Sequence, residues 1–122
     1  MTVYEAIAQV DRLRDNTVPT DIKVGWLSKT DEYFYEEIMK GREGAPAGFE
    51  PYNEADMGRA LLIPSPYDEL YQHKLEAMIY YEQREIKKYA SSMALYNQAM
   101  NEYIRKYVRE HAALPHPHVK YW

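Results

Sequence analysis

The sequence predicts an all-α fold, a small four-helix bundle with a long loop between the second and third helices and an extended C-terminal arm. Two observations predict it. Apolar residues recur at three- and four-residue spacings in four separate stretches. Four of the five glycines gather between residues 41 and 60, and two prolines interrupt the chain after residue 112. A chain of 122 residues has the size of one domain. We therefore expect one helical domain over residues 1–112 and an arm over residues 113–122.

The first helix is expected over residues 3–14. Thr2 and Glu5 have the spacing of a capping box, in which a hydroxyl and a carboxylate satisfy the first backbone donors of a helix. Residues that follow at helical spacing form one apolar stripe: Val3, Ala6, Ile7, Val10 and Leu13. The helix should therefore face a core along this stripe.

The second helix is expected over residues 20–40, starting at Thr20 or Asp21 and stopped by Gly41. Its predicted buried face consists of Ile22, Trp26, Leu27, Tyr33, Phe34 and Ile38. The following residues, 41–60, contain four glycines and two prolines without a regular period. Loops of this length in compact domains are usually functional or flexible, so we expect one of these roles. Residues 59–63 form a candidate short extended segment.

The third helix is expected over residues 66–89. Ser65 suits the N-cap and Pro66 the first helical position, where its missing N–H costs nothing. One broad apolar face is formed by Tyr67, Tyr71, Leu75, Met78, Ile79, Ile86 and Tyr89. Glu82 falls in this face, and we expect it where the face reaches solvent or a neighbouring chain.

The fourth helix is expected over residues 92–111, because Ala90-Ser91-Ser92 interrupts the apolar pattern and offers a new cap. Its apolar seam has the spacing of a coiled coil and consists of Met93, Tyr96, Met100, Tyr103 and Tyr107. Such a seam is more often core than interface, and both interpretations stay open. Met and Tyr make the seam adaptable.

Tyrosine is the unusual residue, with 13 copies beside 2 Phe and 2 Trp. A phenol suits surfaces that are wet in the free protein and buried in a complex, although a tyrosine-rich core is the alternative. The net charge of −4 argues against a general nucleic-acid binder. Residues 1–61 carry 12 acidic and 7 basic side chains, whereas residues 62–122 carry 7 and 8. This asymmetry could favour head-to-tail contacts between copies, or be ordinary scatter.

Recognisable catalytic equipment is missing from the sequence. The absence of cysteine excludes disulfides and thiolate chemistry, and no phosphate-binding glycine motif occurs. The adjacent carboxylates Asp31-Glu32 and Glu36-Glu37 diverge on a helix and are expected on a solvated face. The histidines that could form a small metal site are His111, His116 and His118. We therefore expect no enzymatic activity, no cofactor and no metal.

A membrane or secretory role is not expected either. No run of about 18 apolar residues occurs, and the first residues lack the pattern of a secretory signal. The expected location at this point is the cytosol, or else the protein is released only by lysis.

Several stretches together resemble one known family. They are residues 2–7 with Val10, Asp11 and Leu13; Lys23, Trp26, Leu27 and Asp31; the stretch Leu62-Ile63-Pro64-Ser65-Pro66-Tyr67-Asp68-Glu69-Leu70-Tyr71 with Ala77, Ile79 and Tyr81; and Tyr96-Asn97. The chain resembles the head–tail connector proteins (adaptor or head-completion proteins) of long-tailed bacteriophages and of related prophages in Gram-positive bacteria.

The resemblance implies an all-helical structural subunit that forms a ring homo-oligomer under the portal, possibly from a monomer in isolation. Its implied partners are the portal protein and a stopper or tail-completion protein, and DNA would pass through the ring without sequence-specific binding. The implied location is the head–tail interface of the virion, and the host cytoplasm during assembly.

Aromatic and terminal residues are the candidate contacts of such a subunit with its neighbours. They are Tyr67, Tyr71, Tyr81, Tyr96, Tyr103, Tyr107, Val119, Tyr121 and Trp122. The resemblance implies that the C-terminal arm reaches into the portal. The alternative function is a helical regulatory or protein-interaction module that binds DNA or a partner protein. A small bundle that binds metal or a small molecule through the terminal histidines is the third possibility.

Overall fold

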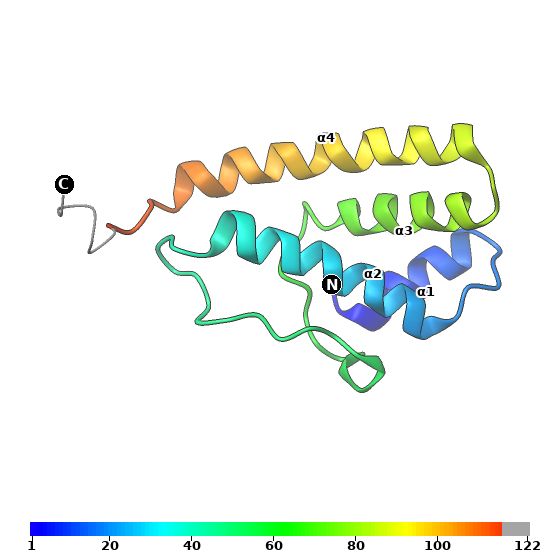
Figure 1. Ribbon diagram of the computed structural model, residues 1–122, viewed down its shortest axis with the longest axis horizontal. Coiled ribbons are helices and arrows are strands. Elements are labelled where there is room, and N and C mark those ends of the chain that lie inside the picture. The colour runs from blue at the N-terminus through cyan, green and yellow to red at the C-terminus, as the bar shows by residue number, and fades with distance from the viewer. Residues whose placement is uncertain (116–122) are drawn as a thin grey trace.

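The computed structural model of the chain describes residues 1–115, which form an all-α helical bundle, as predicted (Figure 1). A π-helical turn, η1 (Tyr35–Met39), continues the second helix, and a short 3₁₀ turn, η2 (Glu54–Asp56), lies in the long loop. The four helices are α1 (Val3–Leu13), α2 (Thr20–Phe34), α3 (Glu69–Glu82) and α4 (Ile86–Glu110). Within residues 1–115 there is no β-strand beyond two isolated bridges.

The bundle is elongated along α4. At 25 residues α4 is about 37 Å long, and it runs antiparallel to the shorter α3 and extends beyond it (Figure 1). The turn over residues 83–85 lies at one end of the molecule, which we call the corner end. Residues 111–115 lie at the opposite end, which we call the exit end (Figure 1).

Helix α1 has the predicted start and almost the predicted length. The Glu5 N–H donates to Thr2 Oγ1 at 3.1 Å, and the Thr2 N–H donates to Glu5 Oε1 at 2.8 Å, which completes the capping box. The predicted stripe is buried except for Leu13, whose side chain is 44% exposed. Leu13 is the last residue of the helix, where the chain leaves the core.

Helix α2 begins at Thr20, as predicted, and together with η1 spans the predicted range up to Gly41. Gly41 has a φ of +82°, a left-handed conformation that glycine adopts without strain. Two residues predicted to be buried, Ile22 and Tyr33, are instead exposed. Ile22 lies in the first turn of α2, and Tyr33 faces an open space between α2, α3 and α4.

The boundary between α3 and α4 differs from the prediction of helices over residues 66–89 and 92–111. Helix α3 ends at Glu82, and α4 starts at Ile86. The Glu85 N–H donates to the Tyr80 carbonyl at 2.9 Å, and the Arg84 N–H donates to the Tyr81 carbonyl at 3.0 Å. This is a Schellman motif, whose left-handed position is filled by Arg84 with a φ of +62°. Glycine at this position would be the usual signal for the end of a helix. Because arginine stands there instead, the sequence carries no stop signal.

The serines predicted to cap the fourth helix lie inside α4 instead. Ser91 Oγ donates to the Lys87 carbonyl at 3.1 Å, four residues earlier, so the helix itself satisfies this hydroxyl. Ser92 is buried, and its small side chain suits close packing. The interruption of the apolar pattern therefore does not interrupt the helix.

The start of α3 also differs, because Ser65 does not cap the helix. Residues 65–68 form a turn in which the Tyr67 N–H donates to the Pro64 carbonyl at 2.9 Å, and Asp68 occupies the N-cap. The two prolines thus shape the approach to the helix, and α3 begins three residues later than predicted. The extended segment before them pairs with the N-terminus through a bridge between Thr2 and Ala60.

Candidate functional site

The predicted contact tyrosines occupy two different environments. Tyr71, Tyr96, Tyr103 and Tyr107 are buried within the subunit, Tyr71 with 0% exposure. These four residues belong to the core of the subunit in this conformation, and their role as contacts with a partner stays a prediction. The seam of α4 therefore has the core role, the commoner of the two interpretations left open by its spacing.

The remaining predicted contact residues are differently placed. Tyr67 is partly buried against the core, whereas Tyr81 is 55% exposed at the corner end, close to the exposed carboxylate of Glu82. The three terminal candidates lie outside the described residues: Val119, Tyr121 and Trp122. Tyr81 is thus the candidate that the structure leaves most accessible.

Tyr71 is part of a buried polar network around Asp31, a carboxylate with 0% exposure. Asp31 accepts hydrogen bonds from Tyr71 Oη at 2.5 Å, Tyr52 Oη at 2.6 Å and the Leu62 N–H at 2.9 Å. Tyr71 Oη in turn accepts the N–H of Ile63 at 2.9 Å. The network joins α2, α3 and the end of the long loop, so this loop is fixed to the core.

Burial sets the proton affinities in this network. Desolvation raises the pKa of the Asp31 carboxyl, while the three hydrogen bonds oppose that rise. Desolvation and the nearby Asp31 charge raise the pKa of Tyr71 well above its ordinary value, and the same causes raise that of Tyr52. Both phenols therefore remain hydrogen-bond donors over the physiological pH range.

The sequence analysis placed Asp31 on a solvated face beside Glu32, and for Asp31 this was wrong. Glu32 is exposed, but Asp31 lies four residues after the buried Leu27 and three before the buried Phe34. That spacing is the signal that could have identified Asp31 as buried. A buried carboxylate needs donors, and two of the many tyrosines supply them.

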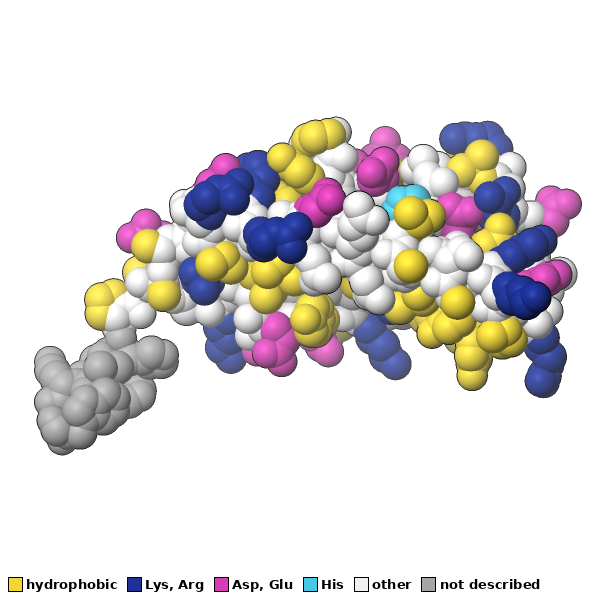
Figure 2. All heavy atoms as spheres, turned by 90° about the horizontal axis from the view of Figure 1, so that it is seen from above, with side chains coloured by type: hydrophobic (Ala, Val, Ile, Leu, Met, Phe, Trp, Pro, Cys, Tyr) yellow, Lys and Arg dark blue, Asp and Glu magenta, His cyan; other side chains and the backbone are white. Residues whose placement is uncertain are grey.

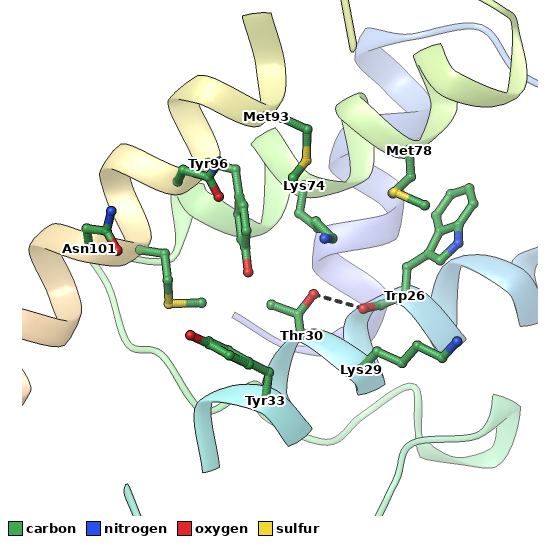
Figure 3. A pocket seen from close by; sticks show the side chains of 11 residues that line it. Trp26, Lys29, Thr30, Tyr33, Lys74, Met78, Met93, Tyr96 and Asn101 are labelled. Carbon is green, nitrogen blue, oxygen red and sulfur yellow. Dashed lines mark hydrogen bonds between the residues drawn. The ribbon is translucent and has the colours of Figure 1, made fainter. Parts of the chain in front are cut away.

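An open cleft lies between α2, α3 and α4, with a volume of about 490 Å³ (Figure 3). Toward the exit end, Phe34 joins α2 to α4 by contacts with Tyr103 and Tyr107, at ring-centroid distances of 5.5 and 5.4 Å. Farther from the exit end, α2, α3 and α4 do not close on one another, and the cleft lies between them. Its lining comprises Trp26, Lys29, Thr30, Tyr33, Lys74, Met78, Met93, Tyr96, Asn97, Met100 and Asn101.

Polar groups converge in the middle of this cleft. The side chains of Lys74, Tyr96 and Thr30 point toward one another from three helices (Figure 3). Lys74 Nζ lies 4.9 Å from the centroid of the Tyr96 ring. Desolvation lowers the pKa of Lys74 and raises the pKa of Tyr96 to about 12. Sequence analysis missed this site, because the lining comes from three helices whose rotation was unknown.

The exit end is fixed to the residues that follow η1. The Leu114 N–H donates to the Gly41 carbonyl at 2.8 Å, and the Glu43 N–H donates to the Ala112 carbonyl at 3.0 Å. Arg42 Nη1 donates to the His111 carbonyl at 2.9 Å. These bonds hold residues 111–114 against the body.

The histidines do not assemble a metal site in the described part of the chain. No group of three His, Asp or Glu side chains in residues 1–115 could hold a metal ion. The ring of His111 stacks on Tyr107 at a centroid distance of 3.9 Å. The other two candidates, His116 and His118, lie outside the described residues. Among residues 1–115, no helix is long and apolar enough to cross a membrane.

The surface on the α4 side mixes apolar and charged side chains (Figure 2). The large apolar residues that are exposed on α3 and α4 are Tyr81, Ile86, Leu95 and Val108. They are spread from the corner end, at Tyr81 and Ile86, along α4 to Val108.

Comparisons with protein-family models, with curated proteins and with solved structures found no match for this chain.

Proposed function

We propose that the protein is a structural subunit of a bacteriophage head–tail connector, without enzymatic activity. In this role it forms a ring under the portal, extends the DNA channel and joins the head to stopper or tail proteins. The sequence resemblance of residues 2–31 and 62–97 to such connectors supports the proposal.

The observation that carries the proposal is that the two ends of the subunit differ. At the exit end, hydrogen bonds to residues 41–43 hold residues 111–114 against the body. At the corner end, about one α4 length away, Tyr81 and Ile86 are exposed (Figure 1). A connector subunit needs this polarity, because it must contact one partner above the ring and another below it.

The exposed apolar residues also suit contacts between copies. Leu95 and Val108 lie on the outer side of α4, away from its buried seam. A ring requires two different patches on each subunit, and the mixed surface offers apolar anchors among charges. An acidic protein also suits a channel through which DNA slides, since it does not attract phosphates.

The test is to mix the protein with the portal protein encoded in the same gene cluster, and to image the complex by negative-stain electron microscopy. A ring stacked coaxially on the portal is the expected result. A well-folded protein that forms no complex with that portal would contradict the proposal.

The cleft favours a second candidate, a helical module that binds a partner protein, because an open site of this kind suits one protein segment. This candidate predicts a monomer or dimer and no ring with the portal. Its DNA-binding form predicts an affinity for DNA that falls with salt, and the net charge of −4 disfavours it.

A further inference from the structure

The cleft between α2, α3 and α4 has an unbalanced charge. Its two charged lining residues, Lys29 and Lys74, are both cationic, and no carboxylate is among the lining side chains. Within residues 1–115, no carboxylate oxygen lies within 4.0 Å of either ammonium group. The buried Lys23 and the partly buried Lys106, in contrast, do have carboxylate partners, Asp11 and Glu110.

Lys74 is held in place without such a partner. It rises from α3 between the two other helices, is partly buried, and lies over the Tyr96 ring (Figure 3). Withdrawing an ammonium group from water costs free energy, which an anion entering the cleft would recover. The hydroxyl of Tyr96, directed at the same point, is a second donor for that anion (Figure 3).

The walls around these donors are apolar. Trp26 and Tyr33 come from α2, Met78 from α3, and Met93 and Met100 from α4. Thioethers and aromatic rings adapt their shape to an apolar side chain. The lining of α4 runs over nine residues, about 12 Å from first to last, which matches three to four residues of an extended peptide.

We propose that this cleft is the docking site for a short peptide segment of a partner protein, in which one Asp or Glu is flanked by large apolar side chains. The carboxylate binds Lys74 and Tyr96, and the apolar side chains lie against Trp26, Tyr33 and the methionines. This inference deepens the proposed function and rests on it only for the identity of the partner, because the peptide test uses the isolated subunit.

The test uses capped tetrapeptides in which one glutamate is placed among leucine and phenylalanine, and matched peptides with glutamine instead. Binding is followed by the fluorescence of Trp26 in a Trp122→Phe background, and by chemical-shift changes of backbone amides. We expect the glutamate peptides to bind at least about fivefold more tightly than the glutamine peptides. The shifted amides should cluster on the facing sides of α2, α3 and α4.

Variants distinguish binding of the peptide in this cleft from general attraction of its carboxylate to surface lysines. Lys74→Met should remove the preference for glutamate, and Tyr33→Ala should weaken binding of both peptides, since half of this side chain is exposed and its loss spares the fold. Lys106→Met is the matched control, because Lys106 also lies over a tyrosine ring, that of Tyr67, but outside the cleft. It should leave peptide binding unchanged. If Lys74→Met fails to fold, Lys74→Arg serves in its place: it keeps the positive charge and should keep the preference for the glutamate peptides.

Three results would overturn the proposal. They are equal affinity for glutamate and glutamine peptides, amide shifts located elsewhere, and binding of phenylbutyrate as tight as that of the glutamate peptides. The last would identify a site for small carboxylates. Loss of peptide binding with an intact portal ring would refute the cleft inference alone, and peptide binding without a ring would refute only the connector proposal.

Discussion

At the scale of single residues, Asp31 is the side chain that attaches the long loop between α2 and α3 to the core. It accepts hydrogen bonds from two phenols and from the Leu62 N–H, so it connects α2 to α3 and to the segment before Pro64. All three donors are directed at a carboxylate with no exposed surface. Removing the acceptor would leave buried donors without partners, which costs more than the hydrogen bonds contribute.

Asp31→Ala should lower the free energy of unfolding by about 3 kcal/mol, because Tyr52 and Tyr71 would each retain an unpaired buried hydroxyl. Urea unfolding followed by circular dichroism measures this. Glu32→Ala, at the exposed neighbouring position, is the control and should change the value by less than about 0.5 kcal/mol. Similar effects of the two substitutions would contradict the network.

The buried phenols also predict an alkaline limit of stability. Burial raises the pKa of Tyr52, Tyr71 and Tyr96 in the folded protein above the value of about 10 expected after unfolding. Above that pH the native state binds more protons than the unfolded state, so stability falls as the pH rises. Below it, the contribution of these groups is fully present.

We therefore expect part of the tyrosinate absorbance to appear only when the helical circular dichroism is lost. Both signals can be recorded on one sample during a titration with base. Complete ionisation of all tyrosines with the helical signal intact would contradict the burial of these three phenols.

The sequence left open whether the abundant tyrosines form contact surfaces or core, and Tyr71 and the α4 seam lie in the core of the subunit. Burial of a phenol depends on whether an acceptor such as Asp31 faces it. That acceptor lies 40 residues away in the chain. Local spacing identifies the apolar stripe, but it does not identify partners at such distances.

At the scale of elements, the turn between α3 and α4 is held by an unusual residue. Arg84 adopts the left-handed conformation in which glycine normally ends a helix. A side chain with a Cβ atom is strained there. The turn is also tied to the rest of the molecule, because Gln83 Nε2 donates to the Asp15 carbonyl at 2.9 Å.

Arg84→Gly should raise the free energy of unfolding by about 1 kcal/mol, because it removes the strain at a φ of +62°. Arg84→Ala is the control: it removes the same charge but keeps the Cβ atom, and should give no such gain. Thermal unfolding of the two variants at one pH measures the difference. A gain of equal size for alanine would mean that charge, not backbone conformation, is responsible.

The α4 seam gives a second prediction at this scale. Tyr103→Asp should destabilise or unfold the protein, because the buried Tyr103 ring contacts Phe34, Tyr67 and Tyr107. Leu95→Asp, on the exposed side of the same helix, should leave the melting temperature nearly unchanged. If Tyr103→Asp kept both the mass and the melting temperature of the wild type, Tyr103 would be neither core nor interface.

The first two helices were predictable because their boundaries carry local signals. Thr2 and Glu5 mark one start, and Gly41 marks the end of the second helical segment. The boundary between α3 and α4 carries none, since the stop is made by Arg84 and the helix that follows has no side-chain cap. The serines at 91 and 92 imitate a cap, but Ser91 donates to the Lys87 carbonyl within the helix and Ser92 is buried.

At the scale of the whole molecule, the exit end separates the body from the C-terminal segment. Among residues 1–115, Leu114 is the last residue with a backbone hydrogen bond to the body. Removal of residues 116–122 keeps the hydrogen bonds between residues 111–114 and residues 41–43, so the shortened protein should still fold and melt cooperatively near the wild-type temperature. In the connector proposal, the same truncation should abolish binding to the portal.

Differential scanning calorimetry and a pull-down with the portal protein test the two parts of this prediction. A shortened variant that still forms rings on the portal would show that the C-terminal segment does not carry the contact. A large loss of stability would show that the removed residues belong to the core.

The attachment of residues 111–114 to residues 41–43 has a mechanical consequence. A tensile load applied at Pro115 does not act on α4 alone, because the Leu114–Gly41 and Ala112–Glu43 hydrogen bonds transmit it to the start of the loop behind η1. The force is thus shared between the long helix and α2, both of which contribute buried residues to the core. An anchor of this kind resists peeling of α4 from the bundle when the terminal segment is pulled.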